Sequence, residues 1–302
     1  MLAVATIERL IKENCEVIAV ARPGSARLMN IPEDEKVNIV ELDLKDIATL
    51  PEVLKLLSVE TADYFFHFSW EGTHGASRDD VDLQLENIGY AVGAVRAAAA
   101  LKCEVFLGAG SQAECGKLPD GVKVAPDTAC FPVTGYGIGK LCASQLTRLE
   151  AKKLGIRHVW CRILSVYGPY DGAHTMVMSG IGLMLEGKKA SYTKAEQMWD
   201  YIYCKDAAKA FVLAAFKGRD GAVYPVGSGE VRPLSEYITA IRDAVDPSLP
   251  IGFGEIDYYP GQVMYLCADT EALKNDTGFV PDYTFEQGIK ETVEWYREEF
   301  SL

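Results

Sequence analysis

The chain has 302 residues, of which 30 are Lys or Arg and 43 are Asp or Glu, so its formal net charge is −13. This acidic balance argues against binding to nucleic acid or to anionic membranes, since both partners require a positive face. Hydrophobic residues make up 49% of the chain. No apolar run approaches the roughly 18 residues of a membrane span, so we expect a cytoplasmic globular protein.

Helices and apolar strands alternate through the first half of the chain. In chain order the pattern predicts a helix over 1–13, strands over 15–21 and 37–44, a helix over 51–58, a strand over 63–69, a helix over 80–101, a strand over 105–110, a polar loop over 112–134, a helix over 136–154 and a strand over 158–166. This alternation favours an α/β fold with a doubly wound parallel sheet, Rossmann-like, covered by helices on both faces.

The pattern loosens after Gly168 and Pro169. The expected elements here are helices over 176–186, 206–216, 234–245 and 285–300, and strands over 198–203 and 222–226. We therefore expect a main domain over 1–168. A smaller α/β subdomain should follow over 169–302, with some of its chain returning to the main domain. Ligands of such sheets bind at the carboxyl ends of the strands, so the site should lie between the two parts.

Cysteine and histidine are spread rather than clustered. None of the eight cysteines forms a C-x-x-C pair, and the four histidines lie far apart in the sequence. This spacing is typical of reduced cysteines in the core of a cytosolic protein. It predicts no metal site, since a zinc site needs clustered ligands.

The strongest constellation for chemistry is Ser111, Tyr136 and Lys140. Ser111 follows the glycine-rich end of a predicted strand, and Tyr136 and Lys140 are one helical turn apart. A Lys ammonium beside a phenol lowers the pKa of the phenol, so Tyr136 could exchange a proton with a carbonyl or alcohol oxygen. The Ser111 hydroxyl could hold the same oxygen. Such a set suits hydride transfer between a nicotinamide and a sugar or alcohol carbon. A second Tyr-x-x-x-Lys pair, Tyr201 and Lys205, has no strand-end Ser upstream.

Several sequence blocks together resemble one known family. They are D-L-K-D at 43–46, H-F-S-W at 67–70, S-Q-A-E-C-G at 111–116, the Tyr136/Lys140 pair and R-I-L-S-V-Y-G-P at 162–169. With these blocks the chain looks like an extended short-chain dehydrogenase/reductase of the NAD-dependent epimerase/dehydratase family, over nearly its whole length.

The resemblance implies that the main domain over 1–168 binds a dinucleotide and that the subdomain over 169–302 binds the substrate. It also implies roles for individual residues. Ser111, Tyr136 and Lys140 take the catalytic places. The cofactor-binding places fall on Arg22, Asp43, Leu44, Phe68, Ser69, Trp70, Asn87, Tyr136 and Lys140. The substrate-binding places fall on Ser111, Gln112, Ser165, Trp199 and Tyr259. Trp199 and Tyr259 stand where nucleotide-sugar enzymes often carry arginines, and they could stack on a sugar or a base or simply belong to the core.

The start of the chain departs from the family pattern. Met1, Leu2 and Ala3 align with the tail of the family's G-x-x-G-x-x-G turn, and the first strand and first two glycines are absent. We expect that the gene start was assigned at an internal Met; a shortened form is the alternative. Arg22 stands where an acidic residue would bind the ribose of NAD, which slightly favours NADP over NAD unless it is a solvated loop arginine.

Family dehydratases usually carry an Asp-Glu pair just after the catalytic Thr, where this chain has Gln112 and Ala113, and the resemblance therefore disfavours a dehydratase. Glu114, one place further on, is expected to pack or to face solvent. The expected function is an NAD(P)-dependent epimerase or ketoreductase, acting on an activated, nucleotide-linked sugar. The alternative is a non-catalytic, dinucleotide-sensing or scaffolding relative. The family also implies a homodimer formed through the helices at 80–101 and 136–154.

Overall fold

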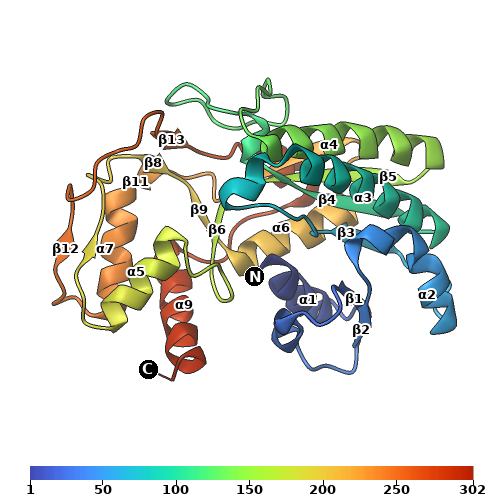
Figure 1. Ribbon diagram of the computed structural model, residues 1–302, viewed down its shortest axis with the longest axis horizontal. Coiled ribbons are helices and arrows are strands. Elements are labelled where there is room, and N and C mark those ends of the chain that lie inside the picture. Colours follow the sequence, from blue (N-terminus) through green and yellow to red (C-terminus); the bar gives the residue numbers. More distant parts are fainter. Residues whose placement is uncertain (302) are drawn as a thin grey trace.

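The computed structural model describes residues 1–301 and divides into a larger and a smaller lobe (Figure 1). The larger lobe contains six parallel strands in two sheets. Four of them make one sheet in the order β10-β5-β4-β3, namely Ala222–Val226, Arg157–Ile163, Val105–Ser111 and Tyr64–His67. The other two, β1 (Val17–Ala21) and β2 (Val37–Glu41), pair only with each other. Within the described residues no strand joins β1 to β3, so each lies at the edge of its sheet. The predicted doubly wound, Rossmann-like fold is confirmed, with this interruption.

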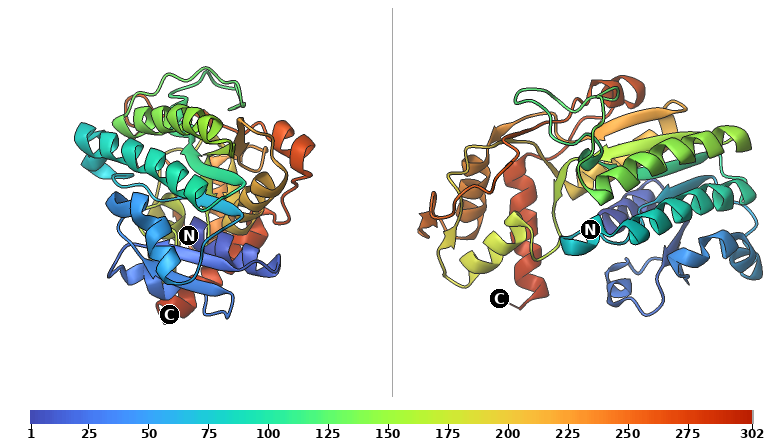
Figure 2. Two further views of the ribbon diagram at one scale, coloured as in Figure 1. Left: turned by 90° about the vertical axis from the view of Figure 1, so that its right-hand side faces the viewer. Right: turned by 45° about the horizontal axis from the view of Figure 1, so that its top comes forward.

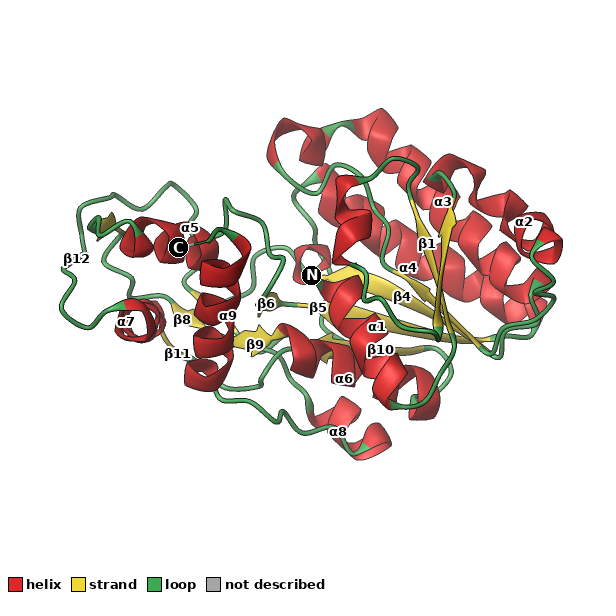
Figure 3. Ribbon diagram, turned by 90° about the horizontal axis from the view of Figure 1, so that it is seen from below, coloured by secondary structure: helices red, strands yellow, loops and turns green. Residues whose placement is uncertain are grey.

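Helices cover both faces of the sheets. On one face α3 (Val81–Ala100) and α4 (Gly135–Leu154) lie side by side (Figure 2). On the other, α1 (Leu2–Lys12) packs along α6 (Cys204–Lys217) (Figure 3). The short α2 (Leu50–Leu56) has a proline in its first turn.

The two long helices have clear start and stop signals. The Asp80 side chain caps α3 by accepting from the Leu83 amide, and Thr134 caps α4 by accepting from the Gly137 amide. Helix α4 ends at Gly155, whose φ of +75° is the left-handed conformation that favours glycine. These caps set where α4 begins, and hence where Tyr136 stands above the sheet.

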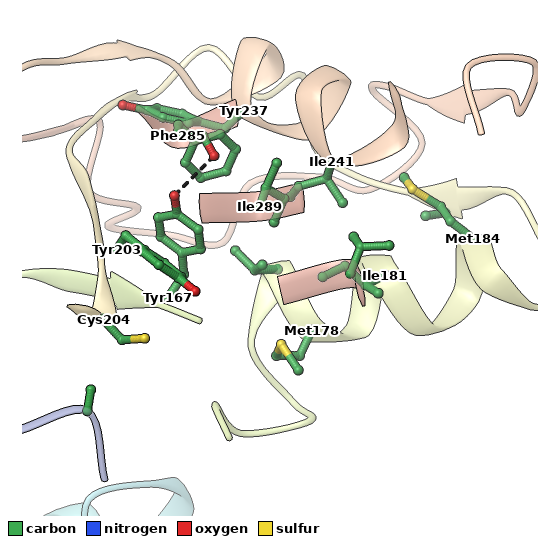
Figure 4. Packing of buried hydrophobic residues seen from close by; sticks show 14 of the residues in the cluster. Tyr167, Met178, Ile181, Met184, Tyr203, Cys204, Tyr237, Ile241, Phe285 and Ile289 are labelled. Atoms are coloured by element: carbon green, nitrogen blue, oxygen red, sulfur yellow. Dashed lines mark hydrogen bonds between the residues drawn. The ribbon is translucent and has the colours of Figure 1, made fainter. Parts of the chain in front are cut away.

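The smaller lobe surrounds its own hydrophobic core. Helices α5 (Met176–Leu185), α7 (Leu234–Val245) and α9 (Phe285–Glu299) pack there against β6 (Ser165–Tyr167) and β9 (Tyr201–Tyr203). Figure 4 shows Tyr167 between Tyr203 and Phe285, and the Tyr167 hydroxyl donates to the Phe285 carbonyl at 3.1 Å. The remaining short elements are β7 (Ala190–Ser191), β8 (Met198–Trp199), β11 (Arg232–Pro233), β12 (Ile251–Gly252), β13 (Tyr265–Leu266) and α8 (Glu271–Thr277).

Two predicted strands are each divided in the structure. The strand expected over 198–203 is split at Asp200, whose buried carboxylate accepts from the backbone amides of Ser228, Gly229 and Ala268. The strand expected over 158–166 is split at Leu164, whose amide donates to the Val226 carbonyl. Both breaks depend on partners far along the chain, so local periodicity could not predict them. None of the helices within residues 1–301 has the length and apolar character that a bilayer crossing requires.

Candidate active site

Ser111 stands at the carboxyl end of β4, where the chain turns into a short 3-10 helix, η4 (Gln112–Glu114). Its hydroxyl accepts from the Ala113 amide at 3.2 Å, and its own amide donates to Glu114 Oε1 at 2.7 Å. This reciprocal capping box satisfies the donors at the start of the turn. It fixes the Ser111 side chain at the sheet edge where parallel α/β proteins bind their ligands.

Tyr136 lies in the first turn of α4, facing Ser111. Burial raises the pKa of the phenol, while a hydrogen bond with the Ser111 hydroxyl and the charge of Arg78 act in the opposite direction. The Arg78 guanidinium carbon lies 4.7 Å from the centre of the Tyr136 ring. The sequence-based expectation of a lowered Tyr136 pKa is wrong for this state, because burial outweighs the neighbouring charge. Of the two cations near the Tyr136 ring, Arg78 lies closer to the ring centre than Lys140, at 4.7 Å against 5.8 Å.

Lys140 is one turn further along α4 and is almost wholly buried. Its ammonium donates to the Ala109 carbonyl at 2.7 Å and lies 4.0 Å from the centre of the Trp70 ring. The distance from Nζ to the Tyr136 ring centre is longer, 5.8 Å. Burial lowers the pKa of Lys140 to about 7, although the charge of Glu114 opposes this shift. Lys140 is therefore near Tyr136 as predicted, but the indole of Trp70 covers it.

The loop after β3 is tied to α3 by two amide side chains. Gln84 accepts from the Trp70 indole at 2.8 Å. Asn87 bonds both the amide and the carbonyl of Glu71, at 3.0 and 2.9 Å. Asn87, which the resemblance placed on the cofactor, thus holds the loop that carries Trp70. Gly139 allows the indole to approach α4 closely, since a Cβ there would lie 3.2 Å from it.

The remaining cofactor candidates lie at the carboxyl ends of β1, β2 and β3. Asp43 caps the next 3-10 helix, η2 (Leu44–Thr49), by accepting from the Lys45 amide at 3.1 Å. Ser69 is exposed, whereas Phe68 packs edge-on against Phe211 in the core. Arg22 is exposed, and its guanidinium is 3.7 Å from the Glu71 carboxylate.

These side chains have the chemistry that a dinucleotide requires at its two nucleoside ends. A bound dinucleotide would meet the Asp43 carboxylate at its adenosine end, and the Tyr136 hydroxyl and the Lys140 ammonium at its nicotinamide end. Helix α1 begins at Leu2 without a side-chain cap. The nucleoside ends fit a dinucleotide, provided that the Trp70 ring leaves Lys140.

The substrate candidates are only partly brought together. The Trp199 indole donates to the Ser165 hydroxyl at 2.8 Å, and the Trp199 carbonyl accepts from Tyr237. Trp199 also packs against the core, which favours the packing interpretation of that residue. Gln112 is half-buried in η4, next to Ser111. Tyr259 lies in an exposed turn with 61% of its surface open to solvent.

Three buried residues beneath Ser111 were not recognised from the sequence as part of the site. Glu114 is fully buried and accepts from Trp160 Nε1 at 2.9 Å and from Arg162 Nε at 3.1 Å, besides the Ser111 amide. Glu114 therefore points into the protein and away from any substrate, in agreement with the packing expectation. Its spacing from Ser111, S-x-x-E, is a capping-box signal that could have located it.

A Rossmann-like sheet with these residues at its carboxyl edge defines a short-chain dehydrogenase/reductase-type protein. The sequence profile of the NAD dependent epimerase/dehydratase family matches residues 1–227. The chain therefore belongs to this family, as the sequence blocks predicted.

Curated relatives match the chain over part of their length. The dTDP-glucose 4,6-dehydratase 1 of Escherichia coli (strain K12) is 29% identical over 176 residues, which cover 56% of this chain and 49% of that protein. The dTDP-glucose 4,6-dehydratase of Xanthomonas campestris pv. campestris is 29% identical over 200 residues, covering 63% and 57%. The chain thus spans about half the length of the curated relatives it matches. Since these relatives are dehydratases, the sequence-based argument against a dehydratase is not supported.

Solved structures match the fold over almost the entire chain. The UDP-N-acetylglucosamine 4-epimerase from Methanobrevibacter ruminantium M1, in complex with UDP-N-acetylmuramic acid, superposes with a TM-score of 0.87 at 22% identity, covering 99% of this chain and 96% of that one. The dTDP-glucose 4,6-dehydratase from Bacillus anthracis str. Ames, in complex with NAD, gives 0.83 at 21% identity, covering 100% and 94%. At this identity the likeness shows the fold alone.

Proposed function

We propose that this protein is an NAD(P)-dependent oxidoreductase that acts as an epimerase or ketoreductase on a nucleotide-linked sugar. The observation that carries the proposal is the juxtaposition of the Ser111 hydroxyl, the Tyr136 phenol and the Arg78 guanidinium at the carboxyl edge of the sheet. These groups offer a proton donor, a second hydrogen bond and a fixed positive charge, which together suit a reacting carbonyl or alcohol oxygen.

In the proposed mechanism Tyr136 acts as an acid in the step that reduces a sugar carbonyl, which in an epimerase follows the oxidation of the alcohol. Because burial raises the pKa of its phenol, Tyr136 carries its proton at neutral pH and can give it to a sugar oxygen. Ser111, held by the η4 capping box, would donate a second hydrogen bond to that oxygen. Arg78 stabilises the phenolate that remains, because the ring lies against its guanidinium. In the reverse direction Tyr136 takes the proton back from the alcohol.

The bound dinucleotide would supply the hydride acceptor and donor. Asp43 and Leu44 would hold its adenosine end, and Ser69, Tyr136 and Lys140 the nicotinamide end. Lys140 can reach a ribose hydroxyl once the Trp70 ring has moved from its ammonium. Arg22 would favour the 2′-phosphate of NADP, although Glu71 competes for the same guanidinium.

The sugar nucleotide is proposed to lie between the larger lobe and the substrate subdomain that begins at residue 169. Gln112 and Ser165 would contact the sugar, and Tyr259 would stack on the sugar or the base, whereas Trp199 would support the core beside Ser165. Tyr259 is the simplest of these to test, because it is exposed and supports no core packing. Tyr259→Ala should raise KM for the sugar nucleotide and leave stability unchanged.

The deciding experiment combines cofactor titration with product analysis. NADH and NADPH are titrated by fluorescence, on this chain and on an upstream-extended form, and then UDP- and dTDP-sugars are incubated with NAD or NADP. Appearance of a sugar epimer, or of a reduced sugar at the expense of NAD(P)H, supports the proposal. Loss of water from the sugar would instead identify a dehydratase. Failure of both forms to bind either cofactor would leave the non-catalytic alternative, which the covering of Lys140 by Trp70 favours.

We also propose that the protein forms a homodimer through α3 and α4. Both helices expose large apolar side chains, among them Leu85 (60%), Ile138 (54%) and Leu149 (58%). Exposed apolar groups on adjacent helices favour burial against a second copy. Leu149→Asp should convert the dimer to a monomer in light scattering, and an unchanged mass would contradict this interface.

A further inference from the structure

Two cysteine sulfurs from different segments face each other beneath the proposed active site. Cys115 follows η4, and Cys130 lies in the loop that leads to α4; their Sγ atoms are 3.9 Å apart. The backbones are also in contact, because the Phe131 amide donates to the Cys115 carbonyl at 3.2 Å. At Gly116 a Cβ would collide with the Phe131 carbonyl oxygen. This close approach, which only glycine permits, holds the two sulfurs near each other.

The surroundings of the two thiols differ. Cys130 is half-buried, and Arg162 Nη2 donates to its sulfur at 3.4 Å. The hydrogen bond with Cys115 and the Arg162 charge lower the pKa of Cys130 to about 7, although burial and Glu114 act against this shift. Cys115 is buried, and its hydrogen bond with Cys130 and its burial raise its pKa. The pair therefore combines a reachable thiolate with a protected thiol.

We propose that Cys115 and Cys130 form a reversible disulfide modification site that reacts with hydroperoxides. Cys130 is the attacking residue, because solvent reaches it and Arg162 stabilises its anion. Cys115 is the resolving residue, because its sulfur is the partner within reach. The Arg162 guanidinium is itself fixed by the buried carboxylate of Glu114, so its contact with Cys130 is part of the folded core.

The reaction balances with hydrogen peroxide as the oxidant. The Cys130 thiolate attacks one peroxide oxygen, the O–O bond breaks, and the leaving hydroxide takes a proton to become water. The Cys130 sulfenic acid then reacts with the Cys115 sulfur, which loses its proton. The S–O bond breaks as the S–S bond forms, and a second water leaves. Two electrons pass from the thiols to the peroxide, and a dithiol reductant reverses the change by thiol–disulfide exchange.

The geometry requires little movement for this bond to form. The sulfurs must approach from 3.9 Å to about 2.05 Å, which side-chain rotation can supply where the backbones already touch. The disulfide would close the loop between residues 115 and 130. It would join the segment after Ser111 to the segment before Tyr136, and so stiffen the edge of the proposed site. The proposal does not depend on the reaction catalysed there.

The first test is stoichiometric oxidation of the whole chain with hydrogen peroxide. The eight thiols of the reduced protein should fall to six, the intact mass should fall by about 2 Da, and mass spectrometry should find the 115–130 link. Trypsin cleavage at Lys117 or Lys123, both inside the loop, should give fragments that separate on a gel only after reduction. Dithiothreitol should restore all eight thiols.

Variants distinguish this pair from general cysteine oxidation. Cys130→Ser should abolish the link, while the matched control Cys142→Ser, a half-buried cysteine on the surface of α4, should retain it. Iodoacetamide at pH 7 should modify Cys130 roughly ten times faster than Cys142. Because Cys115→Ser affects a buried position, circular dichroism must first show that it folds. The proposal would be overturned by a disulfide that does not join Cys115 to Cys130, or by equal alkylation rates for Cys130 and Cys142.

Discussion

The carboxyl ends of β4 and of β1 belong to the same Rossmann-like lobe, but their charged groups are held in different ways. Beneath β4 the Glu114–Arg162 pair is 3.1 Å long, with side chains only 0% and 4% exposed. Beyond β1 the Arg22–Glu71 pair is 3.7 Å long, and its side chains are 65% and 50% exposed. The first pair is part of the folded core, whereas the second leaves its charges open to solvent or to a ligand. The residues proposed to carry out the chemistry are therefore supported by a buried ion pair, whereas the residues proposed to bind the nucleotide are beside an exposed one.

The largest expected effect is on turnover, and it comes from Tyr136 at the carboxyl end of β4. Tyr136→Phe removes the proposed acid and should lower turnover by about 10²- to 10⁴-fold, because only the phenolic proton is lost. Initial rates on the sugar nucleotide turned over by the wild type measure the change. The variant should keep the wild-type unfolding midpoint, which separates a chemical effect from a folding effect. Near-wild-type activity would refute the role of Tyr136.

Breaking the buried Glu114–Arg162 pair should lower the stability of the fold, in addition to any effect on catalysis. Glu114→Ala leaves the Arg162 guanidinium buried without its carboxylate, so we expect a loss of about 3–5 kcal/mol in the free energy of unfolding. Urea denaturation followed by circular dichroism measures it. A loss below about 1 kcal/mol would mean that water or the loop around Cys130 can replace the carboxylate.

Lys140 should make stability depend on pH in a defined window. Its pKa is lowered to about 7 in the folded protein, from an ordinary value of 10.5, so between these values the unfolded chain binds more protons. The Lys140 contribution to stability therefore rises with pH from about 7 to about 10.5, with a slope of at most about 1.4 kcal/mol per pH unit.

The matched variant Lys140→Met has no such proton and isolates this contribution. It should be more stable than the wild type at pH 7, and the difference should shrink toward pH 10. Urea denaturation at a series of pH values gives the two curves. Curves that stay parallel across the window would contradict the buried position of the ammonium beneath Trp70.

A smaller effect is expected at Arg78, which faces the Tyr136 ring from the loop before α3. Arg78→Gln removes a positive charge that favours the phenolate, so the pKa that Tyr136 contributes to the rate profile should rise. Arg78→Lys should recover part of this shift. If the rate of Arg78→Gln depends on pH as the wild-type rate does, Arg78 only supports the structure of its segment and does not act on the Tyr136 phenol.

The smallest effect on the free energy of unfolding should come from Arg22, at the carboxyl end of β1. Arg22→Gln removes an exposed pair and should change the free energy of unfolding by less than about 1 kcal/mol. If Arg22 binds a 2′-phosphate, the variant should lose affinity for NADPH and not for NADH in a fluorescence titration. A large loss of stability, comparable to that of Glu114→Ala, would remove the contrast between the two edges.

The fold class and the family of this protein could be predicted from its sequence alone. The alternation of apolar strands and helices predicted the parallel sheet, because such periodicity reports local burial on two faces. Several short sequence blocks, from D-L-K-D at 43–46 to R-I-L-S-V-Y-G-P at 162–169, together indicated the family. These features are local: a cap, a helical turn and a strand end each involve residues close together in the chain.

Only the tertiary structure decided which groups surround Tyr136 and Lys140. Arg78 and Trp70 come from the loop after β3, while Glu114 and Arg162 come from two neighbouring strand ends. Sequence spacing cannot report such contacts, because their geometry depends on strand order and on helix packing. The same reason explains why burial is the largest influence on the pKa of Tyr136. The interruption between β1 and β3, in contrast, agrees with the sequence pattern, in which the family's first strand was not found.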